Sequence, residues 1–169
     1  MTKDEFWQIV EECKASADVG DCEEQVRLIE EKLARLEPNE IEDFDRIYND
    51  LRLQSYDNRL WAAAYIINGG CSDDGFEYFR GWLISRGREV FENALADPES
   101  LIAPISKEEG DLECESMLYA ALQAYEKKTG NEMPKRPALN WVLKGDDWEE
   151  DTVDDLYPKL AECAEKRWE

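Results

Sequence analysis

LWAAAYII, residues 60–67, is apolar on every side. A helix that is hydrophobic all round must be surrounded by other elements, so this run predicts a central helix. A strand over residues 64–67 is the alternative, but the alanines and the length of the run favour a helix. Asn68-Gly69-Gly70 follows directly and supplies a helix stop.

The flanking sequence consists of amphipathic segments. Some begin with a capping pattern, such as Thr2 with Glu5 or Asp21 with Glu24. Apolar residues at helical spacing, with polar and often acidic residues on the opposite face, predict helices within residues 2–13, 21–36, 38–51, 72–83, 90–95, 114–125 and 152–164.

Two stretches lack such a pattern. Residues 99–111 are expected to form a loop, and residues 131–151 contain prolines and a glycine that break helices. We expect 131–151 to be an ordered arm or loop before the last helix, held in place by Trp141 and Trp148. The chain therefore predicts an all-α fold, a single helical domain over residues 1–169 with about seven or eight helices around the central apolar helix.

The charge balance excludes several classes of function. The chain has 41 Asp and Glu against 20 Lys and Arg, a net charge of −21, and no histidine. Such a surface repels phosphate backbones and anionic lipid, so we expect neither a nucleic-acid nor a membrane partner. Without histidine, Ser-His-Asp and Cys-His catalysis and imidazole metal sites are excluded. We expect no cofactor and no metal.

The five cysteines are odd in number and include no C-x-x-C pair. Most fall on apolar helix faces, which is typical of small reduced core residues in a cytoplasmic protein. Residues 1–5 also lack the features of a secretory signal, so a cytoplasmic location is expected. Cys71 lies just before a predicted helix start, where the dipole stabilises a thiolate, but with no histidine as base a buried structural thiol is favoured.

Basic residues are distributed unevenly. Residues 51–100 hold 8 acids and 5 bases, a net of −3, and there is no lysine between Lys32 and Lys107. Every base in that interval is arginine, whose planar fork binds carboxylates bidentately and tolerates partial burial. Two interpretations follow: central helices that bury their charges as pairs, or an arginine-containing pocket or interface for an anionic group.

The most distinctive stretch is NGGCSDDGFEYFRGWL, residues 68–83. At helical spacing Asp73, Glu77 and Arg80 share a face. One interpretation is an ion-pair network of Glu77 with Arg80 and Arg86. The other is a cleft with carboxylates and Arg80 at its mouth; the candidate ligand or interface residues are then Asn68, Asp73, Asp74, Glu77, Tyr78, Arg80, Trp82 and Arg86. No catalytic residue is assigned, and the pattern does not match a calcium loop.

Several motifs resemble a known family. They are Phe6-Trp7, the block 68–83, residues 87–91 (GREVF) through 96–98 (ADP), and residues 157–160 (YPKL). Together they are similar to an uncharacterised bacterial domain-of-unknown-function family, DUF forty-two-forty. The similarity spans most of the chain, and the family implies no activity, substrate or catalytic residue.

Two functional hypotheses remain. The leading one is a non-enzymatic interaction module that binds a basic protein, since net negative charge accelerates such encounters and aromatic anchors supply affinity. The alternative is a small-ligand binder or enzyme that uses an Asp/Glu/Arg cleft around residues 68–88. Acidic faces that serve only solubility explain the charge equally well, and the oligomeric state is open.

Overall fold

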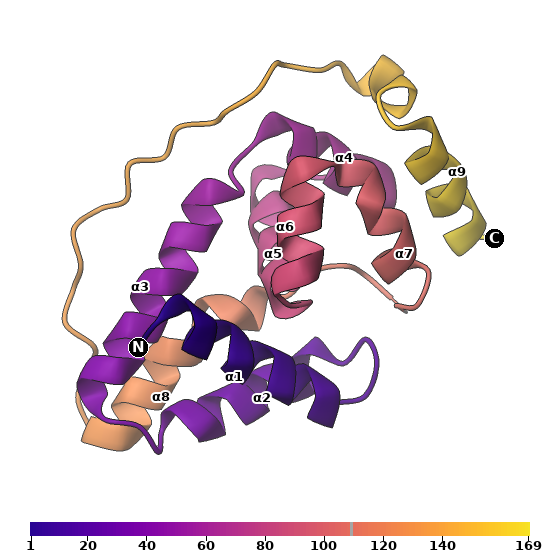
Figure 1. Ribbon diagram of the computed structural model, residues 1–169. Helices are drawn as coiled ribbons and strands as arrows, with labels where there is room; N and C mark the ends of the chain where they lie inside the picture. Colours follow the sequence, from indigo (N-terminus) through magenta and orange to yellow (C-terminus); the bar gives the residue numbers. More distant parts are fainter. Residues whose placement is uncertain (109) are drawn as a thin grey trace.

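The computed structural model describes residues 1–108 and 110–169, and the regular structure in these two ranges is entirely helical (Figure 1). Its α-helices are α1 (Lys3–Ser16), α2 (Cys22–Leu33), α3 (Pro38–Gln54), α4 (Asn58–Asn68), α5 (Asp73–Ser85), α6 (Arg88–Ala96), α7 (Ile102–Ile105), α8 (Ala120–Thr129) and α9 (Pro158–Arg167). Short 3-10 helices occupy η1 (Pro98–Leu101), η2 (Glu115–Leu118) and η3 (Glu150–Asp155). The all-α prediction is confirmed. None of these helices is long and apolar enough to cross a membrane.

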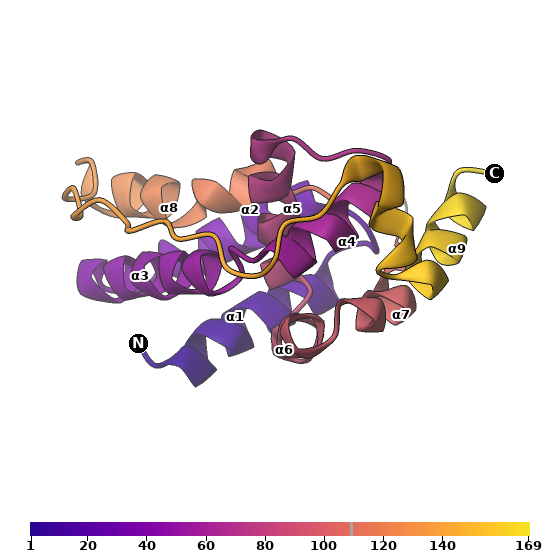
Figure 2. The same cartoon turned by 90° about the horizontal axis from the view of Figure 1, so that it is seen from above.

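The N-terminal helices begin where their caps predict. Thr2 and Glu5 form both bonds of a capping box at the start of α1, and the Asp21 side chain accepts a hydrogen bond from the Glu24 amide in α2. Their apolar faces meet in a common core, in which the Phe6 and Phe44 rings lie 4.4 Å apart. Helix α8 packs against α2 and α3 and completes this end of the molecule (Figure 2).

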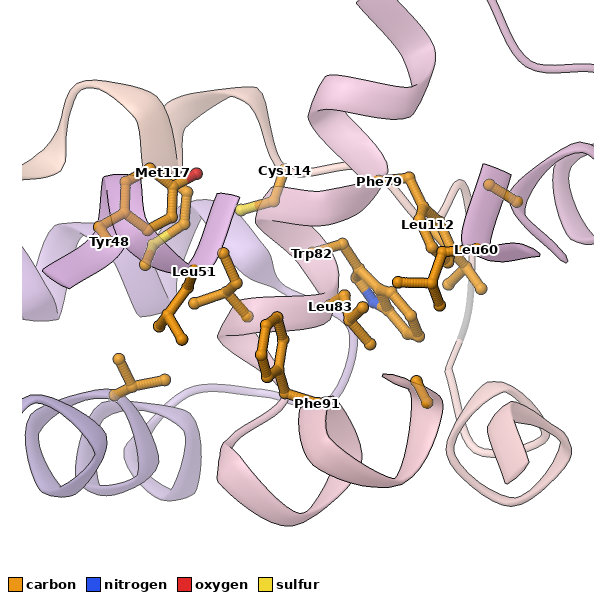
Figure 3. Packing of buried hydrophobic residues seen from close by; sticks show 14 of the residues in the cluster. Tyr48, Leu51, Leu60, Phe79, Trp82, Leu83, Phe91, Leu112, Cys114 and Met117 are labelled. Atoms are coloured by element: carbon orange, nitrogen blue, oxygen red, sulfur yellow. The ribbon is translucent and has the colours of Figure 1, made fainter. Parts of the chain in front are cut away.

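The apolar run 60–67 forms most of α4, and the majority of its side chains are buried, while Trp61 and Tyr65 are half-buried. Helix α5 is enclosed over a longer stretch, since every residue from Phe79 to Ser85 is buried. Side chains from α3, α4, α5 and α6 meet around α5 (Figure 3). At Gly81 an added Cβ would lie 2.6 Å from the carbonyl oxygen of Cys114, so α5 approaches this neighbouring segment more closely than a side chain permits.

Three element boundaries differ from the sequence prediction. The predicted loop 99–111 contains η1 and α7, because Asp97 caps the turn by accepting from the Glu99 amide. The helix expected from residue 114 begins as η2 and becomes α-helical only at Ala120. The last helix starts at Pro158 rather than near Thr152, since proline suits the first helical turn and the preceding residues form η3.

Residues 131–149 have no regular secondary structure and cross the molecule from the end of α8 towards α9 (Figures 1 and 2). We call this segment the arm. Arg136 Nε lies 3.3 Å from a carboxylate oxygen of Asp45 at one end. At the other end the Lys144 carbonyl accepts from the Asn58 amide at 2.8 Å, and the Trp148 indole donates to the Asn58 carbonyl at 3.0 Å. The arm is therefore attached to α3 and to the start of α4.

The cysteines differ from the prediction of an all-reduced set. Cys22, at the start of α2, and Cys114, just before η2, form a disulfide with 6.1 Å between their Cα atoms. Cys13, Cys71 and Cys163 are free. Sequence spacing alone does not show this pairing, because the fold brings together two residues 92 positions apart.

Candidate functional site

Four of the candidate residues line one hollow beside α5. It has a volume of about 220 Å³ and lies between the end of α3, the start of α4, α5 and the arm. Its lining side chains are two arginines, three carboxylates and three aromatic residues, namely Arg52, Arg80, Asp73, Asp74, Glu77, Tyr56, Trp61 and Trp141. Asp73, Glu77 and Arg80 reach it from one face of α5, as their spacing predicts.

Arg80 is the most unusual residue of the hollow. It is only 3% exposed, yet it forms no hydrogen bond or ion pair with any residue in 1–108 or 110–169, and its Nε is completely enclosed. Its guanidinium carbon lies 4.4 Å from the ring centre of Phe76, 5.0 Å from that of Tyr56 and 5.6 Å from that of Trp141. Aromatic faces offset part of the burial cost of a cation, but buried arginines are normally paired as well.

Burial and, to a smaller extent, the neighbouring positive charge of Arg52 lower the pKa of Arg80 to about 10. Both effects act against the charged form of the guanidinium. An anion placed next to Arg80 would reverse them, because an opposite charge favours protonation. The side chain is thus charged at neutral pH, and the carboxylate whose negative charge raises its pKa, Glu77, is itself paired with Arg52.

The carboxylates of the hollow are not equivalent. Glu77 forms an ion pair with Arg52, whose Nη1 also donates to the Asn49 side chain at 2.8 Å. Asp73 and Asp74, in the first turn of α5, are exposed, and neither carboxylate bonds to another residue of the two described ranges. Among the described residues, the hollow therefore has unpaired negative charge at its exposed mouth, on Asp73 and Asp74, and unpaired positive charge at its buried base, on Arg80.

The remaining candidates lie elsewhere. Arg86 donates to Glu108 at 2.7 Å and to Gln25 at 2.6 Å in a separate buried cluster, so the predicted network of Glu77 with Arg80 and Arg86 is wrong. The reason is that α5 turns Arg86 towards α2 and the segment after α7 instead of towards Glu77.

Trp82 is a core residue, 3% exposed, and does not form a rim (Figure 3). Tyr78 is half-buried, and its carbonyl accepts from the Cys114 amide at 2.8 Å. Asn68 ends α4, and its side-chain amide is buried with no partner in residues 1–108 or 110–169. None of the three lines the hollow.

Metal coordination has no support in the arrangement of these side chains. Among the residues the structure describes, no group of three or more His, Cys, Asp or Glu side chains is placed to hold a metal ion. The chemistry that the hollow offers is the recognition of charged groups beside aromatic rings.

A comparison with protein families agrees with the sequence motifs. The model of a family described as "Protein of unknown function (DUF4240)" matches residues 1–127. The chain belongs to this family. No curated protein and no solved structure matches it. The DUF4240 match contains α1 to α7 and most of α8, whereas the arm, α9 and the YPKL motif at residues 157–160 lie beyond it.

Sequence reasoning missed half of the residues around the hollow. Arg52, Tyr56 and Trp61 belong to the DUF4240 match but come from α3, α4 and their connection, and Trp141 comes from the arm outside it. The lysine-free interval that includes Arg52 was a usable signal. The contribution of Trp141 has no local signal, because it depends on how the arm crosses the molecule.

Cys71 lies near the hollow but is not activated. Burial raises the pKa of its thiol to about 12, and the negative charge of Glu113 acts in the same direction. Cys71 is half-buried rather than buried, and its raised pKa agrees with the interpretation of a structural thiol rather than a nucleophile.

This environment predicts slow alkylation of Cys71. At pH 8, iodoacetamide should alkylate Cys71 in the folded protein roughly a hundredfold or more slowly than in the urea-unfolded chain, because only the thiolate reacts. Mass spectrometry of the peptide that contains Cys71 gives both rates. Equal rates in the two states would contradict the assignment of a half-buried, protonated thiol.

Proposed function

We propose that the protein binds a small organic anion in the hollow beside α5, with Arg80 as the principal ligand-binding residue. The observation that carries this proposal is the buried, unpaired guanidinium of Arg80. A buried charge without a partner is expensive, and a bound carboxylate or phosphate would supply two charge-assisted hydrogen bonds to the planar fork. The aromatic rings of Tyr56, Trp61 and Trp141 would contact the carbon atoms of the ligand.

Binding is favoured over catalysis by the state of the neighbouring groups. Glu77 is engaged by Arg52, the Cys71 thiol is protonated, and the chain has no histidine. A general base or nucleophile needs a pKa near the working pH or an adjacent activating group. The hollow therefore offers recognition groups without an activated nucleophile.

The test is calorimetric titration with acetate, benzoate and inorganic phosphate at low ionic strength. At least one should bind, and Arg80→Met should weaken that binding roughly ten- to hundredfold, as expected for the loss of a charged hydrogen-bond donor. Arg88→Met is the matched control, because Arg88 is exposed on α6 and paired with Asp4 and Glu92. Equal losses in both variants, or no binding at all, would overturn the proposal.

The binding of a basic protein is a second candidate, supported by a different surface. A hollow of about 520 Å³ between α2 and the start of α8 is lined by Asp21, Glu23, Glu24 and Glu30. Its one arginine, Arg27, is paired with Glu31 at 2.7 Å.

Two exposed apolar side chains accompany this acidic surface. Tyr119 lines it at 45% exposure, and Leu122, 41% exposed in the first turn of α8, lies next to Gln123, which also lines it. Acidic charge around exposed apolar anchors suits a lysine- or arginine-rich partner.

A titration with a lysine-rich amphipathic peptide tests this second proposal. Binding should weaken with salt and should fall several-fold in Leu122→Ala. Leu156→Ala is the matched control, since Leu156 is also exposed, at 51%, but lies far along the chain beside η3. Peptide binding that changes neither with salt nor in Leu122→Ala would contradict this second proposal.

The cytoplasmic location expected from the sequence stays a proposal, and the disulfide provides its test. Disulfides are rare in reducing cytosol. If the protein is cytoplasmic, alkylation of intact cells before lysis should find Cys22 and Cys114 as thiols in most molecules. A fully oxidised pair would argue against this location.

A further inference from the structure

We infer that the ligand of the hollow beside α5 is a zwitterion, an α-amino acid with an apolar or aromatic side chain. This inference rests on the proposed function, because the carboxylate of the amino acid is the anion bound by Arg80. It adds a binding role for Asp73 and Asp74, which would hold the ammonium group.

The distribution of charge in the hollow carries the first step. Arg52 and Glu77 neutralise each other in their ion pair. This leaves one buried cation, Arg80, opposed by two carboxylates at the mouth, Asp73 and Asp74. A dianion such as phosphate would meet repulsion from both aspartates, whereas a molecule with one negative and one positive end is attracted at both.

The spacing along α5 carries the second step. The guanidinium carbon of Arg80 lies 4.4 Å from the Phe76 ring centre, so the side chain runs back towards the N-terminus of the helix. Asp74 and Asp73 lie two and three residues before Phe76, which is about 3 to 5 Å of axial rise at 1.5 Å per residue. In an α-amino acid both charged groups are bonded to one carbon, so its charges lie about 3 Å apart. Arg80 forms no ion pair with either aspartate although all three line the same hollow, so such a molecule, with a hydrogen bond at each end, can bridge them along the helix.

The walls of the hollow carry the third step. Trp61 is stacked on Phe76 with 4.8 Å between ring centres and 17° between planes, and Tyr56 lies beside them. These rings would contact an apolar side chain of the ligand. A volume of about 220 Å³ corresponds to roughly seven water molecules at about 30 Å³ each, which suits a free amino acid rather than a nucleotide.

The burial of the two charged ends carries the fourth step. Arg80 is enclosed and the aspartates are exposed, so the carboxylate would enter first and the ammonium would remain at the mouth. Blocking either end of the amino acid should therefore weaken binding, each through a different protein residue.

The experiment is calorimetric titration of the full chain with L-leucine, L-phenylalanine and L-tryptophan, each compared with its N-acetyl and its amide derivative. At least one free amino acid should bind, and both of its derivatives should bind at least tenfold more weakly. If the N-acetyl compound binds as well as the free amino acid, the zwitterion inference is overturned while anion binding stands. If none of the compounds binds and benzoate also fails, the proposed function falls as well.

Variants separate the two charged ends. The double variant Asp73→Asn with Asp74→Asn should weaken binding of the free amino acid at least tenfold and leave binding of the N-acetyl compound unchanged or stronger. Asp154→Asn with Asp155→Asn is the matched control, because it removes an adjacent, exposed pair of aspartates away from the hollow. Equal effects of the two double variants would show that only net charge matters and would overturn the inference.

Discussion

Replacing Cys22 by serine is expected to lower the free energy of unfolding by about 2 to 5 kcal/mol. The disulfide to Cys114 closes a loop of 92 residues, more than half of the chain. In the chain-entropy account, the stabilisation grows with the length of the closed loop and approaches the upper end of that range here. Urea unfolding followed by circular dichroism measures the effect, and a reductant should reproduce it in the wild-type protein.

The reduced protein should keep its fold, because other contacts hold the segment that contains Cys114. The Cys114 amide donates to the Tyr78 carbonyl at 2.8 Å, and the Cys114 carbonyl packs on Gly81. Cys163→Ser is the matched control, since that thiol is free and half-buried, and its loss should change stability little. A reductant that leaves the wild-type unfolding midpoint unchanged would refute the disulfide.

Local chemistry explains why the helices could be predicted from the sequence. Thr2 and Ser72 accept hydrogen bonds from amides in the first turn of their helices, and Gly69 ends α4 in the left-handed conformation. Each of these signals involves residues within one helical turn. The apolar spacing that follows them was sufficient to identify the helices α1 to α6.

The features that could not be predicted depend on distant parts of the chain. Three features require the tertiary fold: the Cys22–Cys114 disulfide, the ion pair of Arg86 with Glu108, and the position of Trp141 beside Arg80. The spacing of Asp73, Glu77 and Arg80 correctly placed these residues on one face of α5. It could not show that Glu77 forms its ion pair with Arg52 and that Arg80 is left unpaired among the described residues. Short-range periodicity orients a side chain, and only long-range packing decides what it meets.

Arg80→Met is expected to leave the protein as stable as wild type at neutral pH or to stabilise it by about 1 to 2 kcal/mol. Burial and Arg52 lower the pKa of Arg80 to about 10, so the fold disfavours its charged form. That penalty is about 3 kcal/mol and is present in full below pH 10. It disappears as the pH rises from the folded pKa towards the higher unfolded one. The rings of Phe76 and Tyr56 return about 1 to 2 kcal/mol of it through cation–π contact.

Methionine suits this position because it fills a similar length with apolar atoms that need no partner. Thermal and urea unfolding at pH 7 measure the change, with Arg88→Met, expected within about 0.5 kcal/mol of wild type, as the control for loss of one positive charge. A loss of more than 1 kcal/mol in Arg80→Met would mean that Arg80 is a structural cation–π anchor.

The combination of stability and binding separates the two roles of Arg80. Removing a structural residue lowers stability, and ligand affinity then changes only because the fold is disturbed. For a buried ligand-binding residue the expectation is the opposite. Its removal leaves the ligand-free protein as stable or more stable, and it abolishes the stabilisation that the bound ligand gives. The unfolding midpoint of the wild-type protein should therefore rise when its ligand is added. The midpoint of Arg80→Met should equal or exceed that of the ligand-free wild type and should not change when the ligand is added.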